Sequence, residues 1–380
     1  MPAKVGLLNP ELTEGFGIMR TAKTASIILG GLIFSLSGLV AFAEPPDWQK
    51  ATAAANVARQ KGNYAEAATL YQQALEIQEK KLGPACPEVA ASLNNLAVVY
   101  QEESKDAEAE LLYRRSLQIW EKFHGTDKQL AASLSNLAAL YQDERKDEEA
   151  VPLYNRALAI WEKTGSMESP KAVSALVGLA DIFYSQGNFS DAAPLYKRTL
   201  AIWKKTGQPD SSDAATTLIH LADIYRSQSE YEQAEPLYNR ALAIWEKTGH
   251  AENLELAATL SSLGDIYRSE ERYSEAEPLL VRVLAIREKA FGSDNLDVAA
   301  SANELALLYN CEENYAAAEI FYKKAIQIRE KNLGPQHPDV IRTREIYAAM
   351  LRQEGRKTEA HAIEVSPMKV QLNSFQKATN

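Results

Sequence analysis

The sequence predicts an all-α protein, built as a solenoid of stacked antiparallel helical hairpins. Apolar residues follow helical spacing along most of the chain, and the same pattern returns at a fixed interval. An alanine recurs every 42 residues, with one interval of 41: Ala67, Ala109, Ala150, Ala192, Ala234, Ala276, Ala318 and Ala360. Four residues after the first seven of these comes a large side chain: Tyr71, Tyr113, Tyr154, Tyr196, Tyr238, Leu280 and Tyr322. Because one hairpin is too small to bury its own apolar face, neighbouring hairpins must stack.

Each repeat is predicted to be two helices joined by a short polar turn, as residues 218–249 illustrate. The first half places four residues on one helical face: Leu218, Leu221, Ala222 and Tyr225. The second half has the same spacing: Ala234, Leu237, Tyr238, Ala241, Leu242 and Ile244. Residues 227–230, Ser-Gln-Ser-Glu, form the polar break between them. Pro236 is expected near the first turn of the second helix, where a missing N–H costs little.

The repeats can be placed in order along the chain. We expect them to begin near residues 48, 88, 129, 171, 213, 255 and 297, with Asp47 as the first N-cap. Residues 44–363 then hold seven full hairpins followed by C-terminal capping helices, the last long helix covering about residues 338–352. Three charged residues dilute the core stripe of that helix, as expected for a solvent-facing cap: Arg342, Arg344 and Glu345. Residues 364–380 are polar and aperiodic, which predicts a flexible tail.

The pattern resembles the tetratricopeptide repeat. The small-residue and aromatic positions of that family are visible in one unit as Leu96, Ala97, Tyr100, Ala109 and Tyr113. The 42-residue period is longer than the common period of about 34 residues. The kinesin-light-chain type of repeat is suggested by three segments: LNNLA at 93–97, AEPLYNRALAI at 234–244 and LGPQHPDV at 333–340. The resemblance implies a right-handed superhelical solenoid whose first helices line a concave groove that binds other proteins.

Residues 1–43 lie outside the repeats and resemble a secretory signal peptide. Arg20 and Lys23 precede an apolar run without charge, from Thr24 to Ala43. The run closes with Ala41-Phe42-Ala43, a small-residue cleavage pattern. These features predict an exported protein that is periplasmic or secreted.

Two alternatives concern this N-terminal region. Met19 would give a conventional signal peptide that ends at Ala43, so that the mature chain begins at Glu44. An uncleaved anchor is the competing interpretation, because about 20 apolar residues can span a bilayer. We expect membrane association only in that second case, through the run from Thr24 to Ala43.

The composition excludes several function classes. The 380 residues are 46% hydrophobic and 24% charged, with a net charge of −10, and no basic stripe that would bind nucleic acid is visible. There is no phosphate-binding glycine loop or nucleophile elbow, and the carboxylates recur with the repeat, which is typical of a scaffold. We therefore expect neither catalysis, nor a cofactor, nor a metal site.

The sequence contains two cysteines. Cys86 and Cys311 are more than five repeats apart, which is too far for a disulfide within a solenoid. The favoured interpretation is therefore two tolerated thiols; the alternatives are a reactive thiol and an intermolecular link.

Four tryptophans recur near the ends of the second helices: Trp120, Trp161, Trp203 and Trp245. Packing against the next hairpin explains this spacing better than a ridge of binding residues.

One flank of the first helices is the candidate partner-binding surface. Since successive side chains are about 100° apart, positions 219, 223 and 226 share the flank opposite the buried Ile224. We call this flank in successive repeats the first-helix face; the family resemblance implies that it faces the groove. Eight residues at its centre form the predicted partner site: Val177, Asp181, Tyr184, Ile219, Asp223, Arg226, Asp265 and Arg268.

The chemistry of these eight residues has two interpretations. Asp and Arg three residues apart can form a ladder of exposed salt bridges, each worth about 0–1 kcal/mol. The aliphatic and aromatic residues would be unusual on a purely solvated face, and mixed apolar and charged groups suit a peptide with basic and apolar side chains. The Lys–Asn set of the family's carboxylate clamp is absent here, which disfavours a chaperone-tail adaptor.

Three function classes remain, and the first two are the main alternatives. The first is an exported adaptor that binds an extended or helical segment of another protein in the groove. The second is a structural assembly unit of an envelope or secretion complex, and a detached regulatory half of an enzyme is a third option. The sequence identifies neither the partner, nor the pathway, nor the oligomeric state, and size-exclusion chromatography would separate the first two classes.

Overall fold

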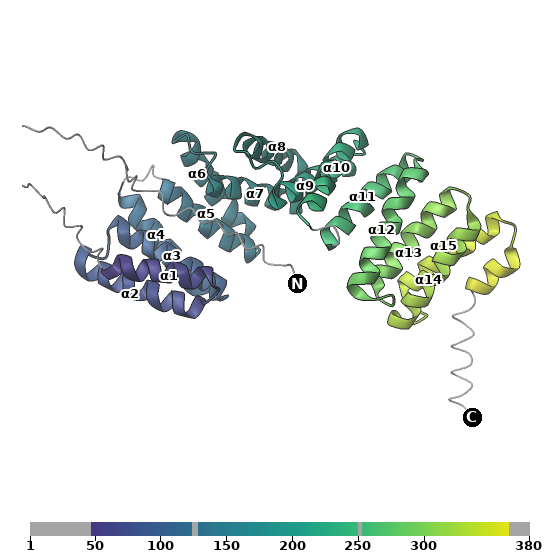
Figure 1. The fold of residues 1–380 in the computed structure, drawn as a ribbon, viewed down its shortest axis with the longest axis horizontal. Coiled ribbons are helices and arrows are strands. Elements are labelled where there is room, and N and C mark those ends of the chain that lie inside the picture. Colours follow the sequence, from purple (N-terminus) through teal and green to yellow (C-terminus); the bar gives the residue numbers. More distant parts are fainter. Residues whose placement is uncertain (1–46, 124–127, 250–252, 365–380) are drawn as a thin grey trace, which may run out of the picture. The chain divides into compact units, whose positions relative to one another are not determined.

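The computed structural model describes residues 47–123, 128–249 and 253–364, and every regular element in these ranges is a helix (Figure 1). The elements in chain order are α1 (Asp47–Gln60), α2 (Tyr64–Leu82), α3 (Pro87–Glu102), α4 (Asp106–Lys122), α5 (Lys128–Asp143), α6 (Asp147–Lys163), α7 (Pro170–Ser185), α8 (Phe189–Lys205), α9 (Ser212–Ser227), α10 (Tyr231–Lys247), α11 (Leu254–Ser269), α12 (Tyr273–Phe291), α13 (Leu296–Cys311), α14 (Tyr315–Leu333) and α15 (Pro338–Gln353). Residues 357–364 form a further short helix. The predicted all-α fold of antiparallel hairpins is confirmed.

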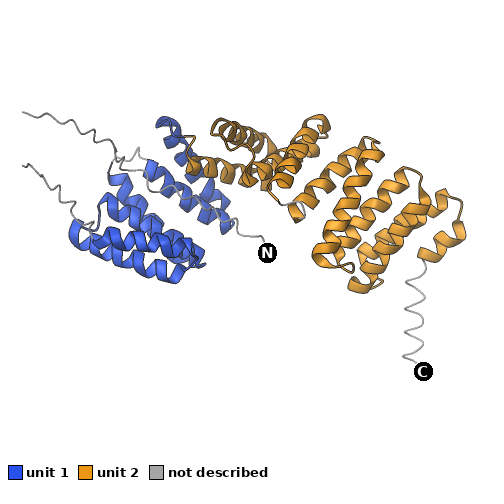
Figure 2. Ribbon diagram, viewed as in Figure 1, with its two compact units in different colours: residues 1–166 blue, residues 167–380 orange. Residues whose placement is uncertain are grey.

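The chain divides into two compact units, residues 1–166 and residues 167–380 (Figure 2). In the first unit the hairpins are α1–α2, α3–α4 and α5–α6, and each packs on the next through its second helix. In the second unit the hairpins α7–α8, α9–α10, α11–α12 and α13–α14 stack in the same way, with α15 packed on α14. All eight residues of the predicted partner site belong to the second unit.

The helix boundaries follow the predicted repeat closely. The first helices of the seven hairpins begin at residues 47, 87, 128, 170, 212, 254 and 296, one residue before each predicted start. Two details were wrong. Asp47 is the first residue of α1 rather than the residue that caps it. Pro236 lies in the second turn of α10, so the helix continues through it with one backbone N–H fewer.

The turn inside each hairpin depends on one residue with a left-handed backbone. Gly187 has φ of 72° after α7, and Ser229 has φ of 60° after α9. In this conformation the amide of the next residue can close the turn with a hydrogen bond. The Glu230 N–H, for example, donates to the Tyr225 carbonyl at 2.9 Å. Glycine adopts it freely, whereas serine pays a steric penalty of roughly 1–2 kcal/mol.

The core lies between the two helices of each hairpin and between neighbouring hairpins. The eight recurring alanines are fully buried, and the large residues four positions later are at most 2% exposed. A small residue lets the helix backbones approach closely, and the aromatic ring fills the adjoining space. The four tryptophans are also buried, which confirms the packing interpretation for Trp120, Trp161, Trp203 and Trp245.

One charged residue of the last long helix is not where the sequence placed it. Arg342 and Glu345 are exposed on α15, as predicted, but Arg344 is buried. Its guanidinium pairs with Glu330 of α14, which compensates the charge. The solvent-facing role predicted for Arg344 is therefore wrong.

Several predictions lie outside the described residues. These are the signal peptide at 1–43, the start at Met19, cleavage before Glu44 and the tail after Glu364, which is itself the last residue of the helix at 357–364. Within the described ranges, no helix is both long enough and apolar enough to cross a membrane.

Candidate partner-binding face

Three neighbouring helices carry the eight predicted residues. Val177, Asp181 and Tyr184 lie on α7, the next three on α9, and the last pair on α11. Because α9 contacts both α7 and α11, the first-helix face is continuous across these repeats. Each of the eight side chains is half-buried.

Two of the three aspartates accept hydrogen bonds from tyrosines of the second helices. Tyr196 on α8 donates its hydroxyl to Asp181 Oδ1 at 2.5 Å, and Tyr238 on α10 donates to Asp223 Oδ1 at 2.5 Å. Burial and the adjacent carboxylate raise the pKa of both tyrosine hydroxyls above its ordinary value. A hydrogen bond to a charged group contributes about 1.5–3 kcal/mol. Asp181 and Asp223 therefore help to hold the first helix of a hairpin to the second.

A further set of contacts links α7 to α9. Tyr184 donates its hydroxyl to Asp223 Oδ2 at 3.4 Å, and its ring stacks on the His220 imidazole with centroids 5.0 Å apart. His220 Nδ1 lies 3.1 Å from the Tyr196 hydroxyl and 3.3 Å from Asp181 Oδ1. Burial and the Asp223 carboxylate raise the pKa of Tyr184 to about 12. The Tyr184 side chain is thus held in place by its contacts with Asp223 and His220.

Asp265 on α11 has a different environment. Leu280 takes the tyrosine position in its repeat, and a Cβ atom added at Gly264 would lie 2.8 Å from Leu280 Cδ2. Asp265 instead accepts from Arg268 Nη2 at 3.1 Å, as its sequence spacing predicted. Its side chain is 38% exposed, compared with 20% for Asp223. Asp265 is thus the more accessible of these two carboxylates.

Buried polar atoms without a hydrogen-bond partner occur on the same face. Within the described chain they include Arg226 Nε on α9 and the side-chain oxygens of Asn303 and Asn310 on α13. The hydroxyl of Tyr322 is also unpartnered, because Leu307 stands where the preceding tyrosines meet an aspartate. Such atoms raise the free energy of the folded protein unless water or another molecule satisfies them.

Tyr196, Tyr238 and His220 also belong to this face and were not predicted from the sequence. The two tyrosines were assigned to the core, and the interval of 15 residues from Asp181 to Tyr196 and from Asp223 to Tyr238 would have revealed the pairs. The salt bridges predicted as the alternative are present, with Arg226 Nη2 3.6 Å from Asp223 Oδ1. They account for only part of the contacts of these carboxylates.

Other candidate chemistry can be located as well. Cys86 is half-buried and Cys311 is exposed, and both thiols are free. Across the described ranges, no group of three or more His, Cys, Asp or Glu side chains is arranged to hold a metal ion.

The fold and this face define an all-helical repeat solenoid with a continuous, chemically mixed surface on its first helices. The tetratricopeptide repeat model matches residues 50–122, 129–205, 213–289, 255–331 and 297–364, and a second tetratricopeptide repeat model matches residues 178–247. The chain therefore belongs to the tetratricopeptide repeat family. Proteins of this kind are generally non-enzymatic scaffolds for protein–protein interaction, and their partners are proteins or peptides.

Solved structures that are similar to this chain include kinesin-light-chain-like repeat proteins. BtubC (BKLC) from P. vanneervenii is 24% identical, with a TM-score of 0.50, covering 65% of this chain and 94% of that one. A putative kinesin light chain from Podospora anserina is 27% identical, with a TM-score of 0.46, covering 53% and 95%. A STAND protein with a tetratricopeptide repeat sensor from Pyrococcus horikoshii is 18% identical, with a TM-score of 0.55, covering 88% and 50%. No curated protein matches the sequence.

Proposed function

We propose that this protein is an exported scaffold that binds an extended or helical segment of a partner protein on its first-helix face. The observation that carries the proposal is the set of unpartnered polar atoms on that face, at Arg226, Asn303 and Asn310. A bound segment with polar backbone or side-chain groups would satisfy them. The family supports a protein or peptide as the occupant.

The partner segment is expected to combine apolar and basic residues. Val177 and Ile219 offer apolar contacts, and Asp265 offers a carboxylate that is 38% exposed. The hydroxyls of Tyr196 and Tyr238 fix the other two aspartates, so little side-chain freedom is lost on binding. The charged contacts should weaken as the salt concentration rises.

Export is part of the proposal and is supported by the sequence. Arg20 and Lys23 before the charge-free run, and Ala41-Phe42-Ala43 after it, favour a cleaved signal peptide. Retention of the run from Thr24 to Ala43 would instead give a membrane-anchored scaffold with the same binding face.

A random peptide library displayed on phage and selected against the protein tests the binding site without knowledge of the partner. We expect enriched peptides to carry alternating apolar and basic residues and to bind more weakly at high salt. The Asp265→Ala variant should lower their affinity about tenfold, equivalent to about 1.4 kcal/mol. Glu255→Ala is the matched control, because Glu255 is exposed near the start of the same helix.

Peptides that bind both variants equally would exclude Asp265 from the site. A failure to enrich any peptide, together with a stable high-order oligomer in size-exclusion chromatography, would favour the structural assembly unit instead. A monomer favours the adaptor.

A further inference from the structure

One carboxylate of the first-helix face lacks the arginine that its repeat equivalents have. The same repeat position on α7, α9 and α11 is an aspartate: Asp181, Asp223 and Asp265. Three residues after the last two come Arg226 and Arg268, whose Nη2 atoms lie 3.6 and 3.1 Å from the respective carboxylates. Three residues after Asp181 comes Tyr184 instead. Within the described part of the second unit, neither lysine nor arginine forms an ion pair with Asp181.

The contacts of Asp181 use only one of its two carboxylate oxygens. Oδ1 accepts from the Tyr196 hydroxyl at 2.5 Å and lies 3.3 Å from His220 Nδ1. Oδ2 has no partner among the described residues of the second unit, and the side chain is 33% exposed. A carboxylate can accept about four hydrogen bonds, so Asp181 can accept more from a bound molecule. Because Tyr196 and His220 hold the carboxylate in place, little side-chain freedom is lost on binding.

Tyr184 provides an aromatic surface beside this carboxylate. Its hydroxyl donates to Asp223 Oδ2 at 3.4 Å, so the side chain reaches from α7 towards α9. Its ring stacks on the His220 imidazole with the two planes 16° apart, and the centroid of the Phe189 ring is 5.8 Å away. The residue is half-buried, so part of the ring is accessible. A planar cation can stack on such a ring.

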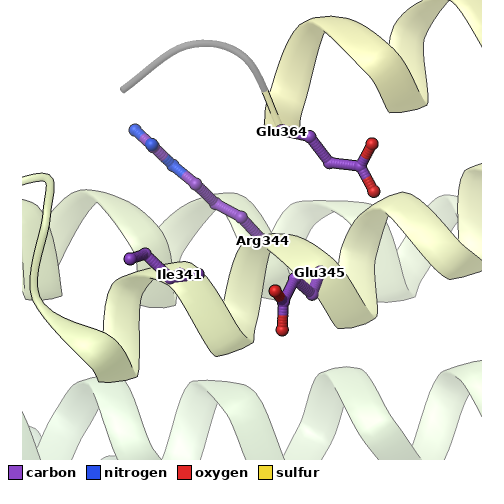
Figure 3. A pocket seen from close by; sticks show the side chains of 4 residues that line it. All are labelled: Ile341, Arg344, Glu345 and Glu364. Carbon is purple, nitrogen blue, oxygen red and sulfur yellow. The ribbon is translucent and has the colours of Figure 1, made fainter. Parts of the chain in front are cut away.

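Charges at the C-terminal end of the second unit are paired differently. Figure 3 shows Arg344 of α15 and Glu364 of the following helix beside a cavity of about 160 Å³. Arg344 pairs with Glu330, and Glu364 pairs with Arg352 at 2.5 Å. The chain itself thus supplies the partners of these two charges, whereas the second unit supplies neither a lysine nor an arginine for Asp181 within its described residues.

We propose that Asp181 and Tyr184 bind an arginine side chain of the partner segment. Its guanidinium takes the role that Arg226 and Arg268 have in the next two repeats: it donates to Asp181 Oδ2 and stacks on the Tyr184 ring. The inference rests on the proposed function and deepens it, because it names the residue type that the partner presents at α7. Lysine fits less well, since its compact ammonium group cannot stack and donate from one plane.

Titration of the full-length protein with acetyl-arginine amide, followed by NMR of labelled histidine rings, tests this subsite without the partner. The chain has five histidines, and His220 contacts both Asp181 and the Tyr184 ring, so its signal reports occupancy. We expect a saturable shift of the His220 signal and no shift of His337, the residue that caps α15. Acetyl-citrulline amide, which has a similar shape without the charge, should give no saturation. Acetyl-lysine amide should bind about threefold more weakly or less.

Three variants locate the binding on Asp181. Asp181→Asn keeps the acceptor for the Tyr196 hydroxyl but removes the charge, and should weaken binding about tenfold. Tyr184→Arg restores the arginine of the neighbouring repeats, which should pair with Asp181 and abolish the shift. Asp213→Asn is the matched control, because it removes an exposed charge near the start of α9 and should leave binding unchanged. Circular dichroism identifies any variant that does not fold, and Tyr184→Arg then replaces Asp181→Asn as the test.

Peptides selected on phage separate this subsite from the proposed function. Enriched peptides should contain an arginine and lose affinity for Tyr184→Arg. Peptides that bind Tyr184→Arg as tightly as the wild type would refute the subsite and leave the proposed function intact. Saturable binding of acetyl-arginine amide without enrichment of any peptide would refute the proposed function but not the arginine subsite. Equal responses of His220 to the arginine and citrulline amides, or no response to either, would overturn the inference.

Discussion

Two buried tyrosines at the same repeat position offer a matched test of the aspartate–tyrosine pairs. Tyr238 and Tyr322 are both 0% exposed, but the first donates its hydroxyl to Asp223 at 2.5 Å, whereas the hydroxyl of the second has no hydrogen-bond partner in the described chain. Tyr238→Phe removes a hydrogen bond to a carboxylate, a loss of about 1.5–3 kcal/mol. Tyr322→Phe removes only an unsatisfied hydroxyl, so its effect on the free energy of unfolding should be about zero or slightly stabilising.

Thermal unfolding followed by circular dichroism measures the difference. For a unit of this size a loss of 1 kcal/mol lowers the Tm by about 2–4 °C, so Tyr238→Phe should lower it by roughly 3–12 °C. Because a solenoid can unfold in parts, amide exchange in α9 and α10 serves as the local readout and should accelerate only in that variant. Equal shifts for the two substitutions would refute the assignment of a structural role to Asp223.

Three further predictions follow from other parts of the chain. The exported protein should begin at Glu44, as N-terminal sequencing would show, and a membrane-bound form that retains the segment before Ala43 would contradict this. Hydrogen bonds from Arg356, and then from Lys323, lower the pKa of Glu319 from 4.5 to about 2, so its contribution to stability is complete above pH 4.5 and is lost as the pH falls towards 2. The Tm of Glu319→Gln should therefore fall less than that of the wild type over this interval, and identical pH profiles would argue against the contacts. Removal of residues 338–380 should lower solubility and helicity in a graded way in circular dichroism, whereas complete unfolding would indicate a single cooperative core.

The fold could be predicted because the same residue pattern recurs in successive repeats. An alanine and a large residue at fixed positions recur along the chain, so each repeat supports the assignment of the others. Helix starts were therefore placed within one residue. Pro236 was misplaced although the polar break was not: α10 begins at Tyr231, directly after the predicted break, so the proline is its sixth residue and lies in the second turn.

The candidate face was harder to predict because its contacts cross between helices. Helical spacing put Asp181, Asp223 and Asp265 on one flank, but it could not show that only the first two meet a tyrosine hydroxyl. Replacing Asp181 or Asp223 by alanine is therefore expected to lower the melting temperature, because each substitution removes a hydrogen bond between two helices. The burial of Arg344 could not be predicted for the same reason, because it depends on a contact with Glu330 in the preceding helix.

A photo-crosslinking amino acid placed at single positions tests the proposed binding face most directly. Incorporated at Ile219 on the first-helix face, it should crosslink a discrete partner from an extract of the source cells, and high salt should reduce the yield. Incorporated at Ala243, an exposed position on the second helix of the same hairpin, it should not. Equal capture at both positions, or capture at Ala243 alone, would contradict the account.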